Sequence, residues 1–323
     1  MNWKRPRCTI AGLAANGEIR RGAMDFLLYL STWEQIVIVL AVFSSVSVLG
    51  LYLVRVLVPL ERLKKNHEVA GFTFGVIGAF YGLLLAFVIV AAWQRYDRAN
   101  AKVQNEAMSL TSLYRLSKGF PQPMAGRLQA EIRRYTGNVI EVEWPAMADD
   151  LRIDDSIREL RLWQIVGSYK PANAREVLLV DKSFDQLSNI SDDLSLRYLY
   201  SRENLPSVVW VVIDAGLLIT IGFSYFFGLE TFKSQALMCA IFSSLLGLTI
   251  LAILELAHPY QGSVTVSDAP YQYALSRMDK LDRVALSDLG VMRETADAAP
   301  LAPLRPSGGG GAPLSERIAR GVP

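Results

Sequence analysis

The sequence predicts an all-α membrane protein in which four transmembrane helices form two hairpins that flank a cytoplasmic helical domain. The first observation is composition, because 51% of the 323 residues are hydrophobic although 20% are charged. The second is distribution, because the apolar residues gather in four long runs instead of spreading along many amphipathic elements. The third is that no strand-like alternation is visible between the second and third runs, which makes this middle domain all-α.

Each run is long enough to cross a bilayer, since ~30 Å of hydrocarbon requires about 20 mostly apolar residues in a helix. A helix also satisfies its own backbone hydrogen bonds, which lipid cannot do. The runs are Gln35–Val54, Val69–Gln94, Pro206–Leu229 and Ser234–Leu254. Asp214 is the only charged residue inside them.

The runs divide the chain into six predicted segments. These are an N-terminal segment (1–33), a first hairpin (34–94), a helical domain (95–205), a second hairpin (206–256), a C-terminal segment (257–289) and a disordered tail (290–323). Met24 has the context of an internal start, so residues 1–23 are either an N-terminal extension or an untranslated stretch. The tail is rich in Ala, Pro and Gly, a composition that does not build a packed core.

The distribution of basic residues predicts the orientation. Eight Lys and Arg residues lie close to the spans on the side of the middle domain, and five lie in the two short loops. This bias places the middle domain and both termini in the cytoplasm.

The middle domain is predicted to be a charge-balanced helical bundle. Residues 95–203 contain 16 Lys and Arg and 16 Asp and Glu, so they carry no basic excess for nucleic acid. The second span is expected to continue as a helix into the cytoplasm until Gly119 and Pro121 end it. The apolar residues that recur at helical spacing in this continuation are Tyr96, Ala99, Val103, Ala107, Leu110, Leu113 and Tyr114. Further helices are expected at Met124–Trp144, which Pro145 ends, Ser156–Ser168 and Asn173–Arg202.

Residue types that support catalysis or metal binding are scarce. The chain has two histidines, His67 and His258, and two cysteines, Cys8 and Cys239, with no metal-ligand spacing among them. The glycine run in the tail precedes no Lys-Ser/Thr pair, so it is no phosphate-binding loop. We therefore expect no metal, no cofactor and no enzymatic activity.

The second span carries small residues along one helical face, at Gly71, Gly75, Gly78 and Gly82. Such a face lets another helix approach closely in lipid. It indicates either tight packing within one subunit or a helix that packs around a symmetry axis and lines a narrow apolar pore. Beside it lie Ala79, Leu83 and Phe87, which are candidates for a pore constriction or for ordinary lipid contact.

Charged residues in and near the membrane give two further candidates. Asp214 is either a functional intramembrane acid or a residue shallow enough to hydrogen-bond near the interface. Arg95, Asp97 and Arg98 follow the second span. They are either interface anchors or, in an oligomer, charged rings that attract anions.

Several stretches of the chain resemble a bacterial four-span membrane family classed as bestrophin-like. They are Asn66–Phe72, Tyr81–Phe87, Trp93–Arg98, Glu106-Ala107, Leu113–Arg115, Glu255–Gly262 and Val264–Pro270. The most specific of them contains Glu255, His258, Pro259 and Gly262. The resemblance covers roughly residues 30–285 and implies a bacterial inner-membrane protein.

A more distant resemblance leads to the bestrophin anion channels themselves. It implies a homo-oligomer, specifically a pentamer, that passes chloride through a neck formed by the second span. Alignment on Ala86-Phe87 places the neck at Ala79, Leu83 and Phe87, whereas alignment on Tyr96-Asp97-Arg98 places it at Gly82, Ala86 and Val90. The first register offers the larger side chains.

The chain also departs from the bestrophin pattern. Ala99-Asn100 stands where tryptophans follow the Tyr-Asp-Arg motif of bestrophins, and no counterpart of the acidic calcium clasp is visible, so no calcium gating is implied.

The leading hypothesis is an oligomeric anion channel that has the lipid bilayer and an inorganic anion as its partners. A membrane-anchored interaction or sensory module that does not conduct is a second hypothesis. A proton-coupled carrier that uses Asp214 is a third, although no inverted repeat links the two hairpins.

Overall fold

The computed structural model describes residues 27–58, 67–149, 156–202, 205–227 and 231–283, and every regular element among them is a helix. The candidate start at Met24, Cys8 and the predicted tail lie outside the described residues. Residues 1–278 and 279–323 form two units, and only the last turn of helix α11 is described in the second.

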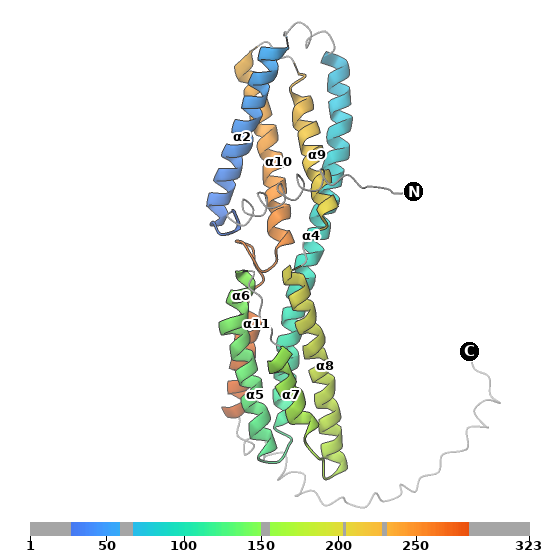
Figure 1. Ribbon diagram of the computed structural model, residues 1–323, viewed down its shortest axis with the longest axis vertical. Coiled ribbons are helices and arrows are strands. Elements are labelled where there is room, and N and C mark those ends of the chain that lie inside the picture. Colours follow the sequence, from blue (N-terminus) through green and yellow to red (C-terminus); the bar gives the residue numbers. More distant parts are fainter. Residues whose placement is uncertain (1–26, 59–66, 150–155, 203–204, 228–230, 284–323) are drawn as a thin grey trace, which may run out of the picture. The chain divides into compact units, whose positions relative to one another are not determined.

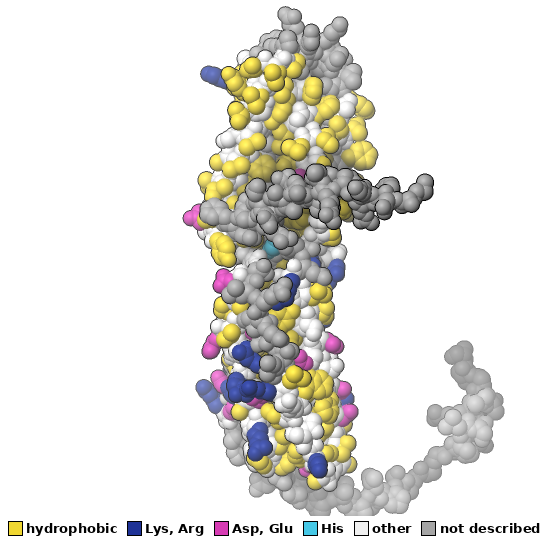
Figure 2. All heavy atoms as spheres, in the orientation of Figure 1, with side chains coloured by type: hydrophobic (Ala, Val, Ile, Leu, Met, Phe, Trp, Pro, Cys, Tyr) yellow, Lys and Arg dark blue, Asp and Glu magenta, His cyan; other side chains and the backbone are white. Residues whose placement is uncertain are grey.

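In the described part of the chain, four helices are long and apolar enough to cross a membrane, as predicted. The corresponding helices are α2 (Thr32–Leu57), α4 (His67–Ser117), α9 (Ser207–Ser224) and α10 (Phe232–Ala257). Figure 1 shows α2, α9, α10 and the first half of α4 side by side. Hydrophobic side chains cover this part in Figure 2, whereas charged side chains gather over the remainder. The grouping of the spans into two hairpins stays a prediction.

Helix α2 packs along α10 through a seam of small and polar residues. Ser44 and Ser244 share a hydrogen bond of 2.8 Å, and Ser243 donates to the carbonyl of Phe43 at 3.1 Å. A Cβ added at Gly247 would lie 2.7 Å from the ring of Phe43, so this glycine permits the close approach. In lipid, such contacts replace the hydrophobic drive that holds helices together in water.

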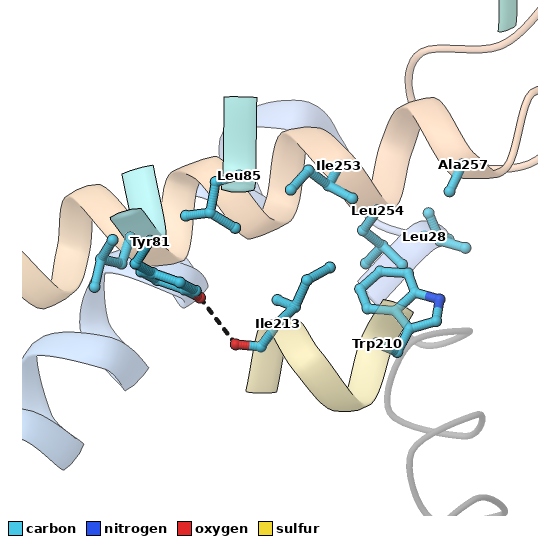
Figure 3. Close-up of a cluster of buried hydrophobic side chains, with 9 residues drawn as sticks. Leu28, Tyr81, Leu85, Trp210, Ile213, Ile253, Leu254 and Ala257 are labelled. Atoms are coloured by element: carbon cyan, nitrogen blue, oxygen red, sulfur yellow. Dashed lines mark hydrogen bonds between the residues drawn. The ribbon is translucent and has the colours of Figure 1, made fainter. Parts of the chain in front are cut away.

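A buried cluster joins α4, α9 and α10 (Figure 3). The Tyr81 hydroxyl of α4 donates to the Ile213 carbonyl of α9 at 2.9 Å. Gly216, one turn further along α9, lies under the Tyr81 ring, and a Cβ added there would approach the ring to 2.3 Å. The absence of a side chain at Gly216 therefore sets the distance between these two helices.

Helix α4 continues without a break for 51 residues and forms the spine of the middle domain, as predicted. Its inner side buries Ala99, Val103, Ala107, Leu110 and Leu113. The other helices of this domain are α5 (Met124–Asn138), α6 (Trp144–Ala148), α7 (Ser156–Gly167) and α8 (Ala174–Arg202). Both α5 and α8 pack on α4, and α7 packs on α5 and on α8.

Two features of this part differ from the sequence-based expectation. The helix that starts at Met124 does not end at Pro145, because a π-helical turn, Val139–Glu143, joins α5 to α6. Pro145 lies in the first turn of α6, where a missing N–H group is tolerated. In addition, the C-terminal segment contains a helix that was not predicted, α11 (Ala269–Arg283).

The contact between Tyr81 and Gly216 gives a test of this packing. Replacing Gly216 by Ala forces the Tyr81 ring outward, and overpacking of this kind costs about 1–3 kcal/mol. We expect Gly216→Ala to lower the melting temperature of the protein in detergent. Gly222→Ala is the matched control, because a Cβ at this position of the same helix meets nothing within 4 Å. Equal melting temperatures for the two variants would contradict the packing.

Candidate functional site

One face of α4 is uncovered along both the apolar and the polar half of the helix. Large apolar side chains more than 40% exposed recur there at helical spacing: Phe72, Val76, Phe80, Leu83, Phe87 and Val90. The same face continues with exposed Asp97, Arg98, Gln104, Asn105 and Met108. This open face of α4 therefore runs for about ten turns, from Phe72 to Met108.

The predicted small-residue face lies beside this row of large side chains and is also mostly uncovered. A Cβ added at Gly75, Gly78 or Gly82 would meet nothing within 4 Å, and one at Gly71 would only touch Phe227 at 3.8 Å. Within the described chain these glycines do not mediate tight helix packing. Gly50, Gly216 and Gly247 do so instead, because a Cβ at each would come within 3 Å of an aromatic side chain.

Both candidate registers of the neck lie on the open face. Ala79, Leu83 and Phe87 are exposed, with Leu83 at 55% and Phe87 at 68%. Gly82, Ala86 and Val90 are exposed as well. Leu83 and Phe87 also border an apolar hollow between α4 and α9.

The three charged residues after the second span are not equivalent. Arg95 points into the chain, where it donates to the Tyr200 carbonyl at 3.2 Å and stacks over the Tyr200 ring at 5.5 Å. Asp97 and Arg98 are exposed on the open face, and Arg98 donates to Gln94 at 3.3 Å. Asp97 and Arg98 are thus the charges that the open face presents at the end of its apolar half.

Asp214 lies on α9, half-buried and engaged within the chain, next to the carbonyl that accepts the Tyr81 hydroxyl. It belongs to the packed contact between α9 and α4.

The family motif after α10 closes a turn. The Glu255 carboxylate accepts the N–H groups of Ser263 and Val264 at 3.0 and 2.9 Å. Gly262 adopts a φ of 93°, which glycine tolerates, and a Cβ there would lie 2.8 Å from Glu255. The ring of His258 bonds the Leu254 carbonyl, and the Pro259 carbonyl accepts the Val266 N–H group. These four motif residues therefore come together in a structural turn.

A buried charge cluster, which the sequence did not indicate as a site, lies on the inner side of α4. We define it as Glu106, Tyr135, Glu143, Arg197 and Tyr271, all of which are essentially inaccessible to solvent. Arg197 donates to Glu106 at 2.9 Å and to Glu143 at 2.6 Å. The hydroxyls of Tyr135 and Tyr271 donate to Glu106 at 2.8 and 2.7 Å.

The cluster contains two carboxylates and one guanidinium, so one negative charge is in excess. Burial on its own would lower the pKa of Arg197, but Glu106 and Glu143 raise it well above its usual value. Burial, helped by the Glu106 carboxylate, holds the pKa of Tyr135 and of Tyr271 well above the ordinary tyrosine value. Both hydroxyls therefore stay protonated and spread the excess charge through their hydrogen bonds.

The amino-acid sequence carries only a weak signal for this buried charge cluster. Glu106 falls among the apolar inner positions of α4, where an unpaired carboxylate would be costly, so its position was the one signal from which a buried partner could have been inferred. Arg197 lies 91 residues further along the chain, and no local pattern connects the two. Among the described residues, no group of three or more His, Cys, Asp or Glu is placed to hold a metal ion.

Comparisons with known proteins match the architecture. A family model described as a bestrophin-like domain matches residues 41–271. A substituted form of a bacterial bestrophin homologue from Klebsiella pneumoniae aligns with a TM-score of 0.58 at 11% identity, covering 76% of this chain and 99% of the homologue. A second structure of a bestrophin homologue from that organism gives a TM-score of 0.54 at 12% identity and covers 75% of this chain and 97% of the homologue. At this identity the likeness shows the fold alone. No curated protein matches the chain.

The buried charge cluster makes a quantitative prediction. Arg197→Met leaves two buried carboxylates without their cation, and breaking a buried pair in this way costs about 3–5 kcal/mol. We expect a large fall in the free energy of unfolding, measured by denaturant titration of the purified protein. Arg134→Met is the control, because Arg134 also pairs with a glutamate, Glu131, but its side chain is 58% exposed. A small and similar effect of both substitutions would show that the cluster is not a stabilising centre.

Proposed function

The chain belongs to the bestrophin-like family, and on that premise we propose that it is the subunit of an oligomeric ion channel of the bacterial inner membrane. In this proposal the open face of α4 lines the pore, and the permeating ion is an inorganic anion such as chloride. The middle domain and both termini lie in the cytoplasm.

The continuity of the open face is the observation that supports this proposal. A helix that only contacted lipid would need an uncovered face in its apolar half, but not in the half that carries Asp97, Gln104 and Asn105. A helix that lines a shared aqueous path needs the same face uncovered in both. Several copies of α4 around one axis satisfy this requirement, and the resemblance to bestrophins implies five copies.

The small residues beside the open face suit such an assembly. Gly75, Gly78 and Gly82 leave room at the helix surface, so copies of α4 can approach closely around the axis. Head-to-tail contacts between identical subunits close into a ring when the rotation permits. The monomer supplies one face, and the pore exists only in the assembly.

The proposed neck is formed by Ala79, Leu83 and Phe87, with Gly82, Ala86 and Val90 as the alternative register. An apolar constriction of this kind excludes water when it is narrow and opens to ions when it is wide. Below it, rings of Asp97 and Arg98 present the exposed charges of the open face, and in this proposal the Arg98 ring draws anions toward the neck.

The chloride flux of liposomes that contain the purified protein tests the neck. Leu83→Ala removes a constricting side chain and should raise the flux several-fold, because a wider apolar neck wets more readily. Leu245→Ala is the control, since Leu245 is similarly exposed, at 62%, but lies on α10.

No flux from a verified oligomer would refute the channel. A monomer or simple dimer in detergent would instead favour a membrane-anchored interaction module, and an Asp214-dependent proton flux would favour a carrier.

The ion preference is tested by the exposed pair below the neck. Arg98→Gln removes the positive ring and should shift the reversal potential toward cation permeability. Asp97→Asn removes the negative ring and should shift it in the opposite direction. The reversal potential is measured in a chloride-salt gradient across a planar bilayer. If neither substitution moves it, these side chains do not line the ion path.

A further inference from the structure

Glu106 connects the open face of α4 to the rest of the chain. Its neighbours on α4, Asn105 and Met108, are exposed on the open face, whereas Glu106 itself is fully buried on the opposite side. The carboxylate accepts hydrogen bonds from α8 through Arg197, from α5 through Tyr135 and from α11 through Tyr271. One side chain of the proposed pore helix therefore joins four elements.

Helix α11 is attached mainly by side chains. None of the described helices packs extensively against its backbone. Tyr271, Ala274 and Met278 are buried, while Gln272, Tyr273, Ser276 and Arg277 between them are exposed. A short helix held along one narrow stripe can detach without unfolding its neighbours.

The Tyr271 hydroxyl is the polar contact of that stripe. It donates to Glu106 at 2.7 Å, and its ring packs edge-on against Trp144 with the ring centres 5.8 Å apart. Trp144 also contacts Tyr260, in the segment that follows α10, with the ring centres 5.7 Å apart. The aromatic residues position the Tyr271 ring, and the hydroxyl connects it to α4.

We propose that the hydrogen bond from Tyr271 to Glu106 is a latch that couples the carboxyl-terminal helix α11 to the pore helix α4, so that release of α11 regulates the channel. The proposal rests on the proposed function, because it treats α4 as the pore helix. When α11 leaves, Glu106 loses one of its donors and the excess negative charge of the cluster loses part of its compensation. The contacts that hold the inner side of α4 therefore change at Glu106, in the same helical turn whose opposite side faces the proposed pore.

Coupling of this kind is reciprocal, so a change at the pore face must also alter the protection of α11. The latch is tested with the full-length protein in two independent measurements. One is the rate of tryptic cleavage at Arg277, which is exposed on α11 and is cut only when the helix opens. The other is the chloride flux of the same preparation in liposomes.

Tyr271→Phe removes the hydroxyl and keeps the ring. Loss of one hydrogen bond to a charged group corresponds to roughly ten-fold or more in an equilibrium constant, so cleavage at Arg277 should accelerate by about that factor. The chloride flux should change by about five-fold or more, the lower end of typical coupling between sites. Tyr273→Phe is the matched control, because Tyr273 lies on the same helix and is 62% exposed. This variant should behave as the wild type in both measurements.

Ala274→Leu separates release of α11 from damage to the cluster. It overfills a buried position of α11 and displaces the helix, while the side chains of Tyr271 and Glu106 themselves are not replaced. The latch requires this variant to accelerate cleavage and to change the flux in the same direction as Tyr271→Phe.

The failures can be told apart. If Tyr271→Phe and Ala274→Leu accelerate cleavage but leave the flux unchanged, α11 is not coupled to the pore and the latch is refuted. If cleavage at Arg277 does not respond to Tyr271→Phe, the hydrogen bond does not hold α11, and the latch is refuted even if the wild-type protein conducts. If the wild-type oligomer passes no chloride, the proposed function fails, and regulation of the channel fails with it.

Discussion

A single unbroken helix has to satisfy two solvents in this protein. Helix α4 is 51 residues long, starts in the apolar part of the chain and ends at Ser117, in the charged part. It must bury one side against α9 and α10 in the first half and against α5 and α8 in the second. Because the same side of the helix faces inward throughout, the opposite side remains open along both halves, and the proposed pore follows from this constraint.

The two halves hold α4 by different physical means. In the apolar half the contacts are close packing and hydrogen bonds to backbone carbonyls, of which Tyr81 to Ile213 is the clearest example. In the charged half the main polar contact is the ion pair between Glu106 and Arg197. A buried ion pair gains little over well-packed apolar residues, but it is costly to break. We therefore regard the buried charge cluster as a device that fixes one arrangement of the helices around α4.

Most of the fold could be predicted because each span carries its own signal. The run Gln35–Val54 lies inside the observed helix Thr32–Leu57, and the apolar spacing after Tyr96 correctly predicted that α4 continues into the middle domain. Helix α11 was missed although its buried positions Tyr271, Ala274 and Met278 recur at helical spacing, because this run covers only about two turns. The π-helical turn was missed because Pro145 is typical of a helix end as well as of a helix start.

The candidate site could be predicted only in part. The glycine spacing of the second span identified one face of α4, and the described chain leaves most of that face open. The pairing of Glu106 with Arg197 depends on how α4 and α8 lie in space, so no motif could have indicated it. The motif around Glu255 was recognised by resemblance, but only the three-dimensional structure shows that it closes a turn.

The arrangement of subunits in the purified particle tests the central claim most directly. An electron cryo-microscopy map of the protein in detergent would show how many copies surround an axis and which helix is nearest to it. The account predicts a closed ring with α4 innermost and Leu83 facing the axis. A ring with α2 or α10 innermost, or a particle that contains a single copy, would contradict it.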